Sequence, residues 1–148
     1  MRHLFALALA LCLAAPAAAQ VGKSLGVVDA NTVAEADLAK MPGMTPALAK
    51  ALVAARPFDN IVALNTFVLG QKLTPAQANE FYKSAFIHIN LNTATEADFM
   101  TIPGAGKRMA HEFDEYRPWK TQAQFEKEIG KYVDAKEVKR LWRYVTIQ

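Results

Sequence analysis

The stretch Asn92-Thr93-Ala94-Thr95-Glu96-Ala97-Asp98, followed by Ile102-Pro103-Gly104, decides the fold because the chain contains it twice. Its earlier version reads Asn31-Thr32-Val33-Ala34-Glu35-Ala36-Asp37 and then Met41-Pro42-Gly43, at an offset of 61 residues. A period of this length, with one version in each half of the chain, predicts two copies of a small structural unit. We place the first copy at residues 28–86 and the second at residues 87–148.

The residues before the first copy are typical of a secretory signal peptide. A positive start, Met1-Arg2-His3, precedes an unbroken apolar run over 4–15, and Ala17-Ala18-Ala19 offers small residues for cleavage. The apolar run is too short to span a bilayer comfortably, which leaves a retained membrane anchor as the less favoured alternative. We therefore predict a leader over 1–19, cleavage near Ala19, an entry linker over 20–27, and a periplasmic or secreted protein.

Composition gives little support to catalysis. The one cysteine, Cys12, lies in the predicted leader, so no disulfide framework is expected and hydrophobic packing must stabilise the fold. His88 and His111 are isolated and have no metal-ligand spacing, so we expect no metal, no cofactor and no enzyme activity. The chain has 17 Lys and Arg against 14 Asp and Glu, and this weak positive charge alone does not indicate nucleic acid.

Each copy is predicted to contain about four short helices, which makes the fold class all-α. Thr32 with Glu35, and Thr93 with Glu96, have the Thr-x-x-Glu spacing of a capping box, in which a hydroxyl and a carboxylate bind free N–H groups. A helix should begin there and end at the Pro-Gly pair, after which a second helix starts. Residues 25–28 and 86–91 resemble strands, and we interpret them as extended connectors.

Polar caps predict the remaining helices of each copy. A hydroxyl, amide or carboxylate oxygen that precedes an apolar run can accept a hydrogen bond from a free N–H of the first helical turn. The residues expected to begin the third and fourth helices in this way are Asn60, Thr74, Thr121 and Asp134.

The second Pro-Gly turn has the features of a phosphate-binding site. Gly104 and Gly106 have no side chain, so a phosphate can approach the backbone, and the following helix begins with unpaired N–H groups and the positive end of its dipole. Lys107 and Arg108 add positive charge beside the turn. The predicted phosphate-binding residues are therefore Gly104, Ala105, Gly106, Lys107 and Arg108. Contacts of this kind read no base edges, so DNA binding should be independent of sequence.

This segment also resembles a known family. Residues 102–110, Ile-Pro-Gly-Ala-Gly-Lys-Arg-Met-Ala, resemble the helix-hairpin-helix motif, and the larger unit from Ile89 to Trp119 is similar to the DNA-receptor module of the ComEA competence family. The resemblance covers both copies and is stronger in the second. It implies two tandem helix-hairpin-helix modules, DNA as the partner, and capture of incoming DNA during natural transformation.

The first Pro-Gly turn departs from the pattern. Thr45 stands where the second glycine should be, Pro46 has no N–H, and no basic residue follows until Lys50. We expect this degenerate turn mainly to pack two helices together. Gly43, Thr45 and Lys50 are secondary candidates for DNA contact.

The last helix offers a second positive surface. Its cations fall at positions i, i+3, i+4 and i+7, which places them on one face. They are secondary candidates for DNA contact, or simply a solvated face: Lys136, Lys139, Arg140 and Arg143. Nearby acidic residues and the weak net charge favour the alternative function, a non-enzymatic protein-interaction or structural module that uses the same fold without binding DNA.

Overall fold

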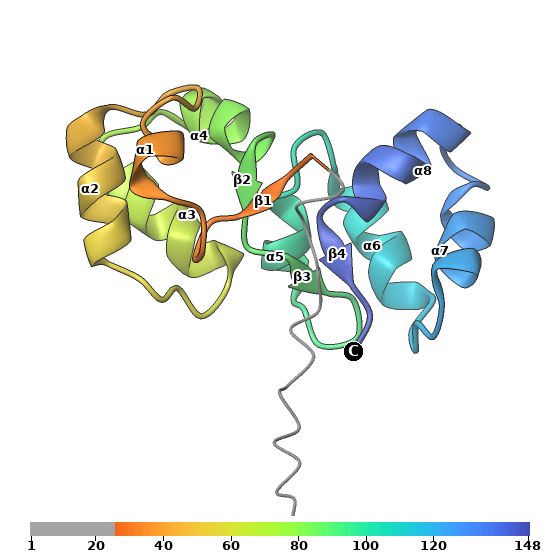
Figure 1. Cartoon of the computed structure of the whole chain (residues 1–148). Coiled ribbons are helices and arrows are strands. Elements are labelled where there is room, and N and C mark those ends of the chain that lie inside the picture. The colour runs from red at the N-terminus through yellow and green to blue at the C-terminus, as the bar shows by residue number, and fades with distance from the viewer. Residues whose placement is uncertain (1–25) are drawn as a thin grey trace, which may run out of the picture.

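The computed structural model describes residues 26–148, so the predicted leader and most of the entry linker lie outside the described residues. This part of the chain is mostly helical, with eight helices and four strands of two residues each (Figure 1). No helix within residues 26–148 is long and apolar enough to cross a membrane.

The two copies have the same order of elements. The first contains β1 (Val28–Asp29), α1 (Glu35–Leu38), α2 (Pro46–Ala54), α3 (Ile61–Gly70), α4 (Pro75–Tyr82) and β2 (Ala85–Phe86). The second contains β3 (Ile89–Asn90), α5 (Glu96–Met100), α6 (Lys107–Glu115), α7 (Gln122–Ile129), α8 (Ala135–Trp142) and β4 (Val145–Thr146). The structure thus has four short helices in each copy.

Two short parallel strand pairs close the copies, so the segments that we interpreted as extended connectors contain paired strands. β1 pairs with β2, where Val28 lies opposite Ala85, and β3 pairs with β4, where Ile89 lies opposite Val145. Each pair therefore joins the beginning of a copy to its end. In Figure 1 the strands lie in the middle of the molecule, with α1–α4 on one side and α6–α8 on the other.

The repeated asparagine has a structural task that explains its place in the repeat. The Asn92 side chain accepts a hydrogen bond from the Trp119 N–H at 2.7 Å and donates one to the Trp119 carbonyl at 2.9 Å. Asn31 binds the N–H and carbonyl of Phe58 in the same way, at 2.9 Å each. Because each amide satisfies both backbone groups of a buried aromatic residue, it connects the start of its copy to the chain that follows the second helix.

The first helix of each copy begins later than predicted, so the Thr32–Glu35 and Thr93–Glu96 capping boxes are wrong. α5 is capped instead by Thr95, which exchanges hydrogen bonds with Asp98 in a capping box. The preceding residues are held in a turn, because the N–H groups of Thr93 and Ala94 donate to the Asn90 carbonyl. In the first copy Ala34 occupies the corresponding position, and α1 has no side-chain cap.

The caps of the later helices agree with the prediction. In each case the capping oxygen accepts a hydrogen bond from the backbone N–H three residues further on, and the four capping residues are Asn60, Thr74, Thr121 and Asp134.

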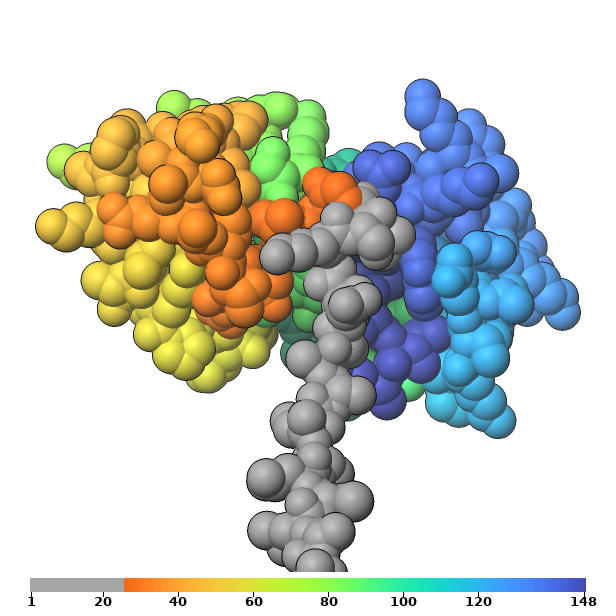
Figure 2. Space-filling view, viewed as in Figure 1, coloured from red at the N-terminus to blue at the C-terminus, as the bar shows by residue number. Residues whose placement is uncertain are grey.

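A continuous cluster of buried apolar side chains runs through both copies. At their junction the Phe86 ring, at the end of the first copy, meets the Tyr144 ring edge-on, with 5.0 Å between the ring centroids. Helices α3 and α5 also make contact across the junction. Figure 2 shows the two copies as lobes that meet in the middle of the molecule. This shared core fixes the position of the first copy relative to the second Pro-Gly turn.

Candidate nucleic-acid interface

The second Pro-Gly turn exposes its backbone at Gly104. This residue has a φ of +78°, a conformation that L-residues with side chains rarely adopt. The Ala105 N–H donates to the Ile102 carbonyl at 2.9 Å, which closes the turn. The turn therefore needs glycine at position 104. Because the Ala105 N–H already has an acceptor, it is not among the free donors of this turn.

Helix α6 begins at this turn with free donors. Gly106 is the residue before the first helical turn, its backbone is extended, and no side chain caps the helix. The N–H groups of Gly106, Lys107 and Arg108 find no acceptor among residues 26–148. Because these groups point out of the helix end and Gly106 is exposed, an anion can accept hydrogen bonds from them.

The first Pro-Gly turn has the same backbone shape but offers fewer free donors. Gly43 has a φ of +75°, close to that of Gly104. Thr45 accepts a hydrogen bond from the Leu48 N–H at 3.2 Å, and Pro46 has no N–H to offer. Lys50 is exposed on α2. The sequence difference at Thr45 and Pro46 thus removes two of the N–H groups that a phosphate could use at this helix end.

The two basic residues that follow the second turn differ in their surroundings. Lys107 is exposed and forms no ion pair within the described part of the chain. The Arg108 guanidinium lies over the Tyr132 ring, 5.1 Å from its centroid, in a cation–π contact. Lys107 is therefore the freer of the two cations, and Arg108 has a partner that fixes its position.

Helix α8 lies beside the second turn. The Arg140 Nη2 atom is 3.3 Å from the position that a β-carbon would take on Gly104. Arg140 also forms a two-bond ion pair with Glu137, at 2.7 and 2.6 Å. This hydrogen-bonded pair lowers the pKa of Glu137 and raises the pKa of Arg140. Arg140 is thus held against the turn, and Glu137 offsets part of its charge.

The other cations of α8 are unpaired within residues 26–148. Lys136 and Arg143 line a hollow of about 410 Å³ together with Arg140, whereas Lys139 is exposed outside it. Three of the four cations predicted to share one helix face therefore line the same hollow.

The corresponding helix of the first copy lacks this charge. An offset of 60 residues pairs the four cations of α8 with Ala76, Asn79, Glu80 and Lys83 of α4. Gly43 faces Gln77 rather than an arginine, with the Gln77 carbonyl 3.3 Å from the position of an added β-carbon. Positive charge near a Pro-Gly turn is thus concentrated in the second copy.

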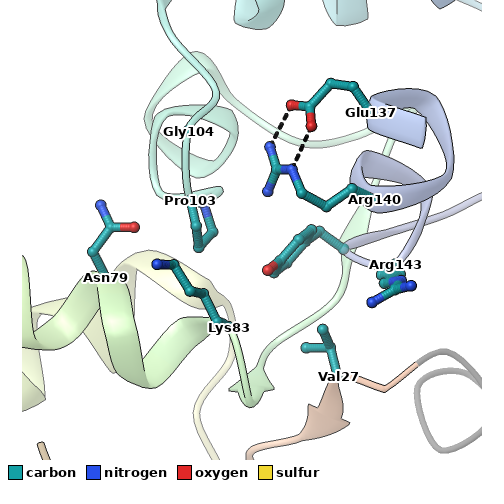
Figure 3. A pocket seen from close by; sticks show the side chains of 9 residues that line it. Val27, Asn79, Lys83, Pro103, Gly104, Glu137, Arg140 and Arg143 are labelled. Carbon is teal, nitrogen blue, oxygen red and sulfur yellow. Dashed lines mark hydrogen bonds and ion pairs between the residues drawn. The ribbon is translucent and has the colours of Figure 1, made fainter. Parts of the chain in front are cut away.

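A cavity of about 560 Å³ lies between the two copies beside the second turn (Figure 3). Pro103 and Gly104 form part of its wall, α8 contributes Arg140 and Arg143, and the end of α4 contributes Asn79 and Lys83. We did not predict Asn79 or Lys83 as site residues, because their place depends on how the copies pack. The repeat does contain a signal, since the offset of 60 that relates α4 to α8 carries Lys83 onto Arg143.

Comparison of the chain with protein-family models, with curated proteins and with solved structures finds no match. Among the residues that the structure describes, no group of three or more His, Cys, Asp or Glu side chains is placed to hold a metal ion.

Proposed function

We propose that this protein binds DNA without sequence preference through the second Pro-Gly turn and the N-terminus of α6, as a tandem helix-hairpin-helix protein. The observation that carries the proposal is the set of N–H groups at Gly106, Lys107 and Arg108 that have no acceptor within residues 26–148. Free N–H groups at a helix N-terminus favour a hydrogen-bond acceptor that carries negative charge. With the predicted leader and the resemblance to the ComEA family, the proposed role is capture of DNA outside the cytoplasm.

The neighbouring cations favour a phosphate backbone over a single small anion. Lys107 stands at the helix end, and Lys136 and Arg143 lie on α8 beside the turn. A polymer with regularly spaced phosphates can contact all of these groups, and such contacts carry no base specificity.

The alternative proposal is an interaction module that does not bind DNA, and the observation that favours it is the first copy. That copy keeps the same order of elements and the same glycine conformation, although Thr45 and Pro46 leave fewer free donors and no basic residue follows until Lys50. The fold therefore does not depend on phosphate binding. If the first copy has a partner of its own, we expect it to bind by contacts other than phosphate binding at the first Pro-Gly turn.

The proposal predicts weak binding of duplex DNA with clear salt dependence. About three to five phosphate contacts should give a slope of log affinity against log salt of roughly −3 to −4.5. Fluorescence anisotropy with several labelled duplexes of unrelated sequence, at salt concentrations between about 50 and 200 mM, measures both the slope and the sequence preference. A DNA affinity that does not change with salt concentration, or binding that is confined to one sequence, would favour the interaction module.

Gly106→Thr should separate DNA binding from folding. Nothing lies within 4 Å of a β-carbon added at Gly106, and its extended backbone suits threonine. The new hydroxyl should cap α6 as Thr45 caps α2, so the melting temperature should stay the same or rise slightly. The hydroxyl should bind the Met109 N–H, and the added side chain should obstruct the approach of a phosphate to the neighbouring N–H groups, which should weaken DNA binding several-fold.

Gly70→Thr is the matched control, because a β-carbon added there also meets nothing within 4 Å. Its DNA affinity should equal that of the parent protein. If the parent binds DNA and Gly106→Thr binds it equally well, phosphate does not bind at the end of α6.

A further inference from the structure

We infer that the cavity between the two copies holds a second phosphate of the bound DNA strand, and that Lys83 of the first copy contacts it. The inference rests on the proposed function and extends it. The first copy would contribute to DNA binding through the end of its last helix rather than through its own Pro-Gly turn.

The shape of the cavity limits what can enter it. Its walls come from the second turn, from α8 and from the end of α4, and it is open to solvent. A volume of about 560 Å³ is far too small for a duplex but accommodates a sugar-phosphate unit. A DNA molecule could therefore present only the backbone of one strand to this cavity.

The charge of the cavity selects an anion. Three cationic side chains line it, Lys83, Arg140 and Arg143, against one carboxylate, Glu137. That carboxylate is already bound by Arg140 through two hydrogen bonds. The buried Tyr144 phenol also lines the cavity, and although burial raises its pKa, the charges of all three cations act in the opposite direction. The three positive groups therefore act on one region of the cavity.

Lys83 can exchange its present partner for a phosphate. Its ammonium group is 2.6 Å from the Glu80 carboxylate, and both side chains are more than half exposed. Exposed ion pairs of this kind stabilise a protein by about 0–1 kcal/mol, so little opposes the exchange. In Figure 3 the Lys83 side chain extends from the end of α4 toward the Pro103–Gly104 turn.

The cavity adjoins the turn that leads to the donors at the α6 end. Gly104 lines the cavity and stands two residues before Gly106, where the free N–H groups begin. A strand with one phosphate at these donors can pass over the bare backbone of Gly104. The next part of the strand then reaches Lys83 and Arg143.

The test compares Lys83→Ala with the parent in DNA titrations over a range of salt. Removing one phosphate contact should weaken binding roughly tenfold at 0.1 M salt and reduce the salt slope by about 0.9. Lys83→Arg should restore both values. Lys40→Ala, which removes an exposed cation of the same copy that is likewise paired with a carboxylate three residues earlier, should bind as the parent does.

A second pair of variants removes the effect of the freed carboxylate. Lys83→Ala leaves Glu80 unpaired, and its charge alone could repel DNA, so the substitution is repeated in a Glu80→Ala background. A loss of affinity and slope in that background supports the inference. If the parent binds DNA but Lys83→Ala has the same affinity and slope as the matched parent, the inference is wrong and the proposed function stands. If the parent does not bind DNA, both are wrong.

Discussion

Replacing Lys107, Lys136, Lys139 and Arg143 with alanine should weaken binding to random-sequence duplex DNA by about 100-fold or more at 0.1 M salt. Lys107 begins α6, the other three lie on α8 or directly after it, and none of the four forms an ion pair within residues 26–148. Each phosphate contact contributes roughly tenfold at this salt concentration, because a neutralised phosphate releases its condensed counterion. The salt slope should fall to about −1, which one remaining phosphate contact, at Arg108, Arg140 or Lys83, can supply.

A charge-matched control removes four exposed lysines elsewhere: Lys40, Lys50, Lys120 and Lys127. This control lowers the net charge by the same amount, so it tests whether position matters. We expect its DNA affinity to stay within a few-fold of that of the parent. Equal losses in the two variants would mean that general attraction by net charge, and not the second turn, accounts for binding.

Trp119→Ala should lower the free energy of unfolding by about 3–5 kcal/mol, as expected when a large buried aromatic side chain is truncated. The Trp119 side chain is 2% exposed, and its ring centroid is 5.5 Å from that of Phe125. Its Nε1–H donates to the Phe113 carbonyl at 2.7 Å, so truncation also leaves a buried carbonyl without this partner. Urea unfolding followed by circular dichroism measures the change.

Trp119→Phe is the companion variant, because Phe58 fills the corresponding place in the first copy. The phenylalanine ring keeps most of the packing and loses the Nε1–H donor, so it should cost clearly less than alanine. An alanine variant as stable as the parent would show that this ring does not support the core of the second copy.

Features that depend on neighbouring residues could be read from the sequence. The four caps at Asn60, Thr74, Thr121 and Asp134 form where they were predicted, because a cap needs only the N–H three residues further on. The α5 cap was placed two residues too early because two Thr-x-x-acid patterns overlap there, Thr93–Glu96 and Thr95–Asp98. The turn held by Asn90 decides between them, and a local pattern does not show it.

Features that depend on distant residues could not be read in this way. A strand of two residues has no periodicity, and β3 pairs with β4 at the other end of its copy. The approach of Arg140 to Gly104, and the place of Lys83 beside the second turn, follow from packing of helices and copies. For the same reason the repeat revealed that Asn31 and Asn92 are equivalent, whereas their hydrogen bonds to Phe58 and Trp119 required the fold.

Phosphate capture by the second Pro-Gly turn is tested most directly by a nuclear magnetic resonance titration of ¹⁵N-labelled protein with a short duplex DNA. Amide signals report directly on the backbone N–H groups that we propose to bind phosphate. We expect the largest shift changes at Gly104, Gly106, Lys107 and Arg108, with little change from Gly43 to Lys50. Binding that shifts other amides and leaves those four unchanged would contradict phosphate capture at the second Pro-Gly turn.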